Sequence, residues 1–246
     1  MISACVFAVL LEHPGSPIHM TIESSLLRRA LAGLAMALTL LAIIFSPLGQ
    51  RSGAHLNPVI TLNYWLLGKV RGSDALAYVC AQFAGGIAGI FASDFMIGFP
   101  IRNSAVNYAA TVPGSLGPGG AFAGELFISF GMMFAVLFFT NHPRWAYATP
   151  FVAATLVALY ITFEAPLSGM SMNPARTLAS AIGASEWTAL WVYFAAPPLG
   201  MVLAALIYTA RFGRNSVLCA KLHHDNPRRC IFRCAYREQR TRAAAA

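Results

Sequence analysis

The sequence predicts an all-α membrane protein with six transmembrane helices and two re-entrant half-helices arranged as an inverted repeat. Its 246 residues are 57% hydrophobic and only 11% charged, with a mean hydropathy of +0.61. Long apolar stretches follow one another with short polar breaks, and one motif containing Asn-Pro occurs twice. So apolar a composition excludes a disordered protein and argues against a water-soluble enzyme.

Five apolar stretches are long enough to cross a membrane, which takes about 20 residues. They lie at about 26–46, 75–97, 121–141, 146–164 and 187–209. The first apolar stretch, residues 1–11, ends at Glu12 and is about half as long as a span. It lacks the basic start and the cleavage site of a signal peptide. We therefore expect the sequence to begin inside its first helix.

Two further apolar segments, 56–70 and 172–182, are too short to cross, and both contain Asn-Pro near their start. Asparagine is a favoured N-cap, and proline is well tolerated in the first turn of a helix. A helix that begins at membrane depth is tolerated only where its backbone is buried in protein or lines a watery cavity. The two half-helices therefore predict a pore or a binding site.

The segments around these half-helices are copies of each other. Residues 52–62 match residues 168–178 at six of eleven positions. If each copy follows the second span of a three-span unit, the odd number of spans inverts the second unit in the membrane. We therefore expect one domain over residues 1–210, with repeats at about 1–97 and 121–210. One half-helix enters from each face, and the two asparagines meet near the midplane.

The positive charge of the chain is concentrated after the last span. Residues 211–246 contain nine Lys or Arg and two acids, whereas residues 1–210 contain eight and seven. A basic segment directly after an apolar span is typical of a cytoplasmic anchor rather than of a nucleic-acid-binding arm. We therefore expect a basic cytoplasmic tail over 211–246 and no nucleic-acid partner.

The doubled motif, SGAHLNPV and SGMSMNPAR between apolar spans, resembles the major intrinsic proteins, which are aquaporins and glycerol facilitators. The resemblance covers residues 1 to about 210. It implies a passive channel for water or small uncharged solutes such as glycerol, with no catalytic step and no cofactor. It also implies a homotetramer with one pore per subunit, surrounded by lipid in a bacterial inner membrane.

The resemblance assigns two motif triplets to the pore centre. Each half-helix would direct the positive end of its dipole, about half an elementary charge, to this point. The two asparagines could also donate N–H groups to the oxygen of a passing molecule. We therefore expect ions to be excluded and a proton wire to be interrupted. The triplets are Asn57, Pro58 and Val59, where the family usually has alanine in third place, and Asn173, Pro174 and Ala175.

A selectivity filter is expected around Arg176, which the resemblance places at the outer constriction. A charge at that depth is costly and usually functional. Counting along the repeats adds Ile161, Met170 and Met36, although one extra residue before the first motif makes Ala37 possible instead of Met36. The ring has no histidine, which departs from many water channels. With one donor and apolar walls, it should prefer small uncharged solutes with some apolar surface.

Glu125 matches a family glutamate that holds the second re-entrant loop by accepting backbone N–H groups. A buried carboxylate is costly unless it has such partners. The rival role is a proton relay, which would make the protein a proton-coupled secondary transporter. A second alternative is a non-conducting membrane scaffold, because the first helix is incomplete.

The expected tail contains side chains that can bind zinc: His223, His224, Cys230 and Cys234. Their spacing matches no strong zinc-finger pattern. We therefore expect no metal site. The other cysteines that lie in apolar stretches, Cys5 and Cys80, are expected to be small core hydrophobes.

Overall fold

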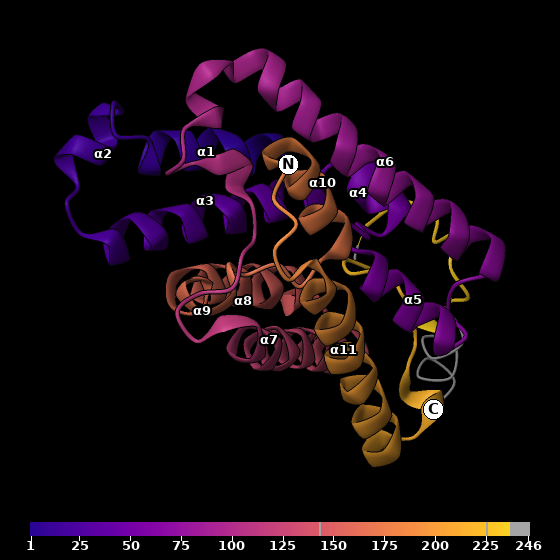
Figure 1. Cartoon of the computed structure of the whole chain (residues 1–246). Helices are drawn as coiled ribbons and strands as arrows, with labels where there is room; N and C mark the ends of the chain where they lie inside the picture. Colours follow the sequence, from indigo (N-terminus) through magenta and orange to yellow (C-terminus); the bar gives the residue numbers. More distant parts are fainter. Residues whose placement is uncertain (143, 225, 237–246) are drawn as a thin grey trace.

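A computed structural model describes residues 1–142, 144–224 and 226–236, and every regular element in these residues is a helix (Figure 1). Five helices are long and apolar enough to cross a membrane, which confirms the five predicted spans. They are α3 (Ser25–Phe45), α6 (Gly72–Ile97), α7 (Gly117–Thr140), α8 (Thr149–Phe163, extended to Ala146 by the short helix η3) and α11 (Leu190–Phe212).

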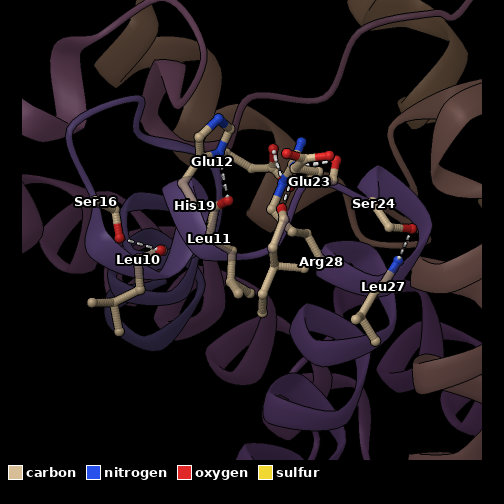
Figure 2. Close-up of polar contacts among 10 residues, drawn as sticks. Leu10, Leu11, Glu12, Ser16, His19, Glu23, Ser24, Leu27 and Arg28 are labelled. Atoms are coloured by element: carbon tan, nitrogen blue, oxygen red, sulfur yellow. Dashed lines mark hydrogen bonds and ion pairs between the residues drawn. The ribbon is translucent and has the colours of Figure 1, made fainter.

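The chain begins with a shorter apolar helix, α1 (Ile2–Glu12), which packs against α3 and α6. A linker containing the short helix α2 (Pro17–Thr21) turns the chain into α3. Figure 2 shows how polar contacts fix this turn. Arg28 donates to the Glu12 carboxylate at 3.2 Å and to two backbone carbonyls of the linker. Ser24 caps α3 by accepting a backbone N–H.

Each re-entrant segment has the same sequence of parts. A short helix ends at a glycine with positive φ, a stretch without regular secondary structure follows, and a half-helix then begins at a proline. The glycines are Gly53 (φ 77°) and Gly169 (φ 80°), and this left-handed conformation costs glycine little. The helices are α4 (Pro47–Ser52) and α5 (Pro58–Leu66) in the first segment, and α9 (Ala165–Ser168) and α10 (Pro174–Ala184) in the second.

Helices from the two halves of the chain pack across one another. The most extensive of these pairs are α3 with α8 and α10 with α6, while within the second half α7 packs extensively against α11. Where α3 crosses α8, a Cβ atom on Gly33 would lie 2.5 Å from the carbonyl oxygen of Ala158. Gly33 therefore permits this close approach, as small residues commonly do between membrane helices.

The second half-helix, α10, packs against α6 at a pair of adjacent glycines with different surroundings. A Cβ atom on Gly86 would lie 3.0 Å from the carbonyl oxygen of Ala175 and 3.3 Å from the Cβ atom of Ala179. A Cβ atom on Gly85 would have no neighbour within 4 Å among the residues the structure describes. Gly86 therefore sets how closely α6 approaches α10.

We expect Gly86→Val to lower the free energy of unfolding by about 1–3 kcal/mol, because the new side chain would push α10 away from α6. Gly85→Val adds the same side chain one position earlier in the same helix, where there is space. Thermal unfolding of the purified protein in detergent measures both. Equal shifts in Tm for the two variants would contradict the packing role of Gly86.

The connection between the two halves, residues 98–116, contains the short helices η1 (Phe99–Arg102) and η2 (Asn107–Ala109) and covers the second re-entrant segment. The Gly114 N–H donates to the carbonyl of Leu167 at 2.9 Å. The hydroxyl of Thr111 donates to that of Thr177 at 3.0 Å.

The chain after α11 is folded against the helices. Following the short helix η4 (Arg214–Ser216), residues 217–222 are all buried, and Figure 1 shows the yellow segment returning beside α4 and α5. Its apolar side chains join the main core, which also contains Leu137 of α7 and Met201 of α11. The predicted basic tail is therefore packed on the helices in its described part, and residues 237–246 lie outside the described residues.

Candidate functional site

Each half-helix is capped by the asparagine that precedes its first proline. The Asn57 Oδ1 atom accepts the N–H of Val59 at 2.9 Å. The Asn173 Oδ1 atom accepts the N–H groups of Ala175 at 3.1 Å and of Arg176 at 3.3 Å. These N–H groups have no partner inside a helix, so the caps satisfy them. Pro58 and Pro174 come first in their helices, where the missing N–H costs nothing.

The same two asparagines connect the re-entrant segments to each other. The Asn57 Nδ2 atom donates to the carbonyl of Met172 at 2.7 Å, and the Asn173 Nδ2 atom donates to the carbonyl of Leu56 at 2.9 Å. Each acceptor is the residue immediately before the opposite asparagine. We call these two reciprocal hydrogen bonds the loop bridge. It places the N-terminal ends of α5 and α10 against each other.

Glu125 of α7 accepts three hydrogen bonds from the second re-entrant segment and is fully buried. One carboxylate oxygen accepts the Ser171 N–H at 2.6 Å and the Ser168 hydroxyl at 2.9 Å. The other accepts the Met172 N–H at 2.7 Å. Met170 and Met172 have positive φ angles of 48° and 54°, which are uncommon for residues other than glycine. The carboxylate therefore bonds a stretch of strained backbone.

The first re-entrant segment is bonded by a different set of groups. Gln82 of α6 donates to the carbonyl of His55 at 2.7 Å. The His55 ring is buried, and its Nε2 atom lies 2.7 Å from the carbonyl of Ala220, which can only accept, so Nε2 carries the hydrogen. Phe232 stacks on this ring, with 5.1 Å between ring centroids. The segment after α11 thus supports the first loop, a contact that the motifs did not reveal.

The expected filter residues come from α3, α8, the second re-entrant segment and α10. Met170 lies in the main hydrophobic core, and Ile161 packs against that core. Arg176 occupies the first turn of α10, where one guanidinium nitrogen lies 3.4 Å from the Ser180 hydroxyl. Met36 lies on α3, where its sulfur is 3.7 Å from the hydroxyl oxygen of Ser3 in α1.

The alternative to Met36, Ala37, is buried in α3. The selectivity filter of Met36 or Ala37, Ile161, Met170 and Arg176 stays a prediction.

Solved structures show the same fold. The aquaglyceroporin from Plasmodium falciparum superposes with a TM-score of 0.62 over 84% of this chain and 89% of its own, at 21% sequence identity. An identity this low supports the fold alone.

Curated sequences are more similar. Aquaporin NIP1-4 of Oryza sativa subsp. japonica is 33% identical over 71% of this chain and 62% of its own length. Aquaporin NIP6-1 of Arabidopsis thaliana is 34% identical over 73% of this chain and 56% of its own length. The chain thus spans about three-fifths of these relatives. The sequence model of the major intrinsic proteins matches residues 3–208. By this match, the chain belongs to the major intrinsic protein family and is an integral, multi-pass membrane protein.

Proposed function

We propose that the protein is a passive channel for water and for small uncharged solutes such as glycerol, and that the path crosses the membrane beside Asn57 and Asn173. The observation that carries this proposal is the loop bridge, which sets the N-terminal ends of two half-helices against each other. The names of the relatives, aquaporins and an aquaglyceroporin, agree with it. The proposal needs no cofactor and no chemical step.

The same geometry supports our proposal that the channel excludes ions. The two half-helices together present about one elementary positive charge at their meeting point, and Arg176 adds a full charge in the first turn of α10. A cation would meet repulsion without oxygen ligands to replace its water. Each asparagine amide has two hydrogens, of which the loop bridge uses one. The other is the donor that we assign to a passing water or hydroxyl group.

The contacts of Glu125 support a holding role. Both carboxylate oxygens already accept hydrogen bonds from the second re-entrant segment. A proton relay would have to release these donors during each cycle, and leaving buried N–H groups unpaired is costly. We therefore assign Glu125 to positioning the second loop rather than to coupling transport to protons.

We also propose that residues 1–210 form one channel domain of two inverted repeats, about 1–97 and 121–210. The C-terminal segment would lie on the cytoplasmic side, next to the loops with Arg51, Lys69 and Arg71. Large apolar side chains such as Phe91, Phe95 and Leu206 are exposed on the outside of the chain. Lipid and neighbouring copies in a homotetramer would cover them.

Stopped-flow measurements on proteoliposomes test the channel proposal. We expect vesicles that contain the protein to change volume faster than empty vesicles when water or glycerol crosses the membrane. Urea and ammonia are tested as further solutes. The rates should not depend on a pH gradient. Rates equal to those of empty vesicles would support a non-conducting scaffold, and uptake driven by a pH gradient would support a proton-coupled transporter.

Arg176→Val is expected to raise the leakage of charged and larger solutes. Removing the positive charge and the bulk of the side chain lowers the barrier at the proposed constriction, and a barrier lower by about 1.4 kcal/mol raises a rate about tenfold. Ion and urea fluxes into the same proteoliposomes measure the change. Arg71→Val is a matched control, because Arg71 is exposed at the start of α6. Unchanged selectivity in an assembled Arg176→Val variant would contradict the filter assignment.

A further inference from the structure

Three cysteines and one histidine converge in the segment that follows α11. They are Cys219, His224, Cys230 and Cys234, and their four candidate ligand atoms lie within 4.8 Å of one another. The sulfur atoms of Cys219 and Cys230 are 3.4 Å apart, and the Nε2 atom of His224 is 3.0 Å from the sulfur of Cys234. The cluster lies outside the proposed pore.

These separations fit a tetrahedral metal centre. Zinc binds thiolate sulfur at about 2.3 Å, so ligand atoms at the corners of a tetrahedron lie about 3.8 Å apart. The separations here, from 3.0 Å to at most 4.8 Å, bracket that value. We propose that Cys219, His224, Cys230 and Cys234 form a zinc(II) site that holds the C-terminal segment in its folded position.

This proposal replaces the expectation of no metal site. The sequence pointed to His223, but the ring of His223 packs on Phe45 instead, with 4.8 Å between ring centroids. Cys219 supplies the fourth ligand. Its distance from Cys230 along the chain gives a spacing that common zinc-finger patterns do not contain. Only the folded chain shows that the four groups face one point.

The surroundings of the cluster suit a metal centre with a net negative charge. Zinc(II) with three thiolates and a neutral imidazole carries a single net negative charge. Lys221 is buried, and the two oxygens to which its ammonium donates, Asn226 Oδ1 and the carbonyl of Arg228, are both uncharged. A buried cation is costly without an opposite charge nearby. The Lys221 N–H also points to the sulfur of Cys219, at 3.5 Å.

The four residues lie on two stretches of the C-terminal segment, about 217–224 and 230–236, which we call the two arms. Hydrogen bonds connect these arms to the helices and to each other. Asn141 at the end of α7 accepts the N–H of Leu218 at 2.7 Å. The N–H of Ala235 donates to the carbonyl of Leu218 at 2.9 Å, which pairs the two arms beside the ligands. The same two arms carry the groups that contact the first re-entrant segment: the Ala220 carbonyl and the Phe232 ring both contact His55. Zinc would therefore stabilise that segment through the fold of these arms.

A disulfide is the competing use of these thiols. It would need two sulfur atoms at about 2.05 Å. It would leave the third thiol and the imidazole without a role, although both face the same point as the other two groups. Zinc uses all four, and a cytoplasmic location would keep the thiols reduced.

Metal content of the purified full chain tests the site. After dialysis against metal-free buffer, we expect elemental analysis to find about one zinc per chain. Cys230→Ser and His224→Asn should lose most of this zinc. Cys80→Ser is the matched control, because Cys80 is an exposed cysteine of α6 outside the cluster, and it should retain the metal.

Two further measurements on the unmutated chain keep the test independent of misfolded variants. Replacement of zinc by cobalt(II) should give the visible absorption of tetrahedral thiolate coordination. Thiol labelling should increase by about three groups per chain on adding a chelator. Labelling that increases only with a reductant would show a disulfide instead. Zinc below about one-tenth per chain without a cobalt spectrum would overturn the proposal, whatever the solute fluxes are.

Discussion

Glu125→Ala is expected to lower the free energy of unfolding by about 3–9 kcal/mol, because it leaves the N–H groups of Ser171 and Met172 and the Ser168 hydroxyl unpaired at about 1–3 kcal/mol for each buried group. These donors belong to a segment in which two methionines have positive φ, so the strained backbone would also lose its support. Solute flux should fall together with the free energy of unfolding. Thermal unfolding in detergent and stopped-flow flux measure the two effects.

Two glutamine variants separate the hydrogen bonds from the charge. Glu125→Gln keeps the shape of the side chain and one accepting oxygen but turns an NH₂ group toward at least one N–H donor, so part of the stability loss should remain. Glu164→Gln removes the charge of a neighbouring carboxylate that accepts neither the Ser171 nor the Met172 N–H, and we expect a change within about 1 kcal/mol. Normal stability and flux in Glu125→Gln, with loss only of transport driven by a pH gradient, would contradict the holding role.

Features that depend on local chemistry could be predicted from the sequence. An asparagine followed by proline already specifies a helix start, so both half-helices were expected within a few residues of where α5 and α10 begin. The repeat then placed the two motifs against each other, and the loop bridge has the symmetry that such a repeat requires. Span lengths followed from the thickness of the membrane.

Features that depend on the rotation of a helix about its axis could not be predicted from the sequence. Successive residues of a helix differ by about 100° around its axis. One extra residue before the first motif therefore decides whether Met36 or Ala37 faces the path. In the structure Met36 lies against Ser3, and Ala37 is buried. A count along the chain cannot resolve this difference.

Features that depend on chain reversal were also missed. The two stretches that carry Cys219 and Cys234 are joined by backbone hydrogen bonds such as that from Ala235 to Leu218. Backbone hydrogen bonds do not depend on side-chain type, so the sequence carries no pattern that reveals them. The sequence showed ligand types in a basic segment, but their convergence and their contact with the first re-entrant segment exist only in three dimensions.

Asn57→Ala and Asn173→Ala are each expected to lower the free energy of unfolding by about 2–4 kcal/mol. Each variant removes a helix cap, at about 1 kcal/mol, and leaves the carbonyl of Met172 or Leu56 without its partner, at about 1–3 kcal/mol. Because both bonds join the same two segments, losing one should weaken the other, and the double variant should cost less than the sum of the two. Thermal unfolding of the single and double variants measures this coupling.

A substitution to aspartate separates the contribution of the helix cap from that of the loop bridge, and it also changes the charge of the proposed pore. Asn173→Asp keeps an oxygen that caps α10 and is stabilised by the helix dipole, but it cannot donate to Leu56. Its negative charge would cancel much of the positive potential of the two helix ends. We therefore expect a smaller loss of stability than in Asn173→Ala, together with a new cation leak in proteoliposomes. Asn63→Ala is the control within α5, because the Asn63 amide donates inside its own helix, to the carbonyl of Val59. A cation-tight Asn173→Asp channel with normal water flux would mean that the solute path does not pass this residue.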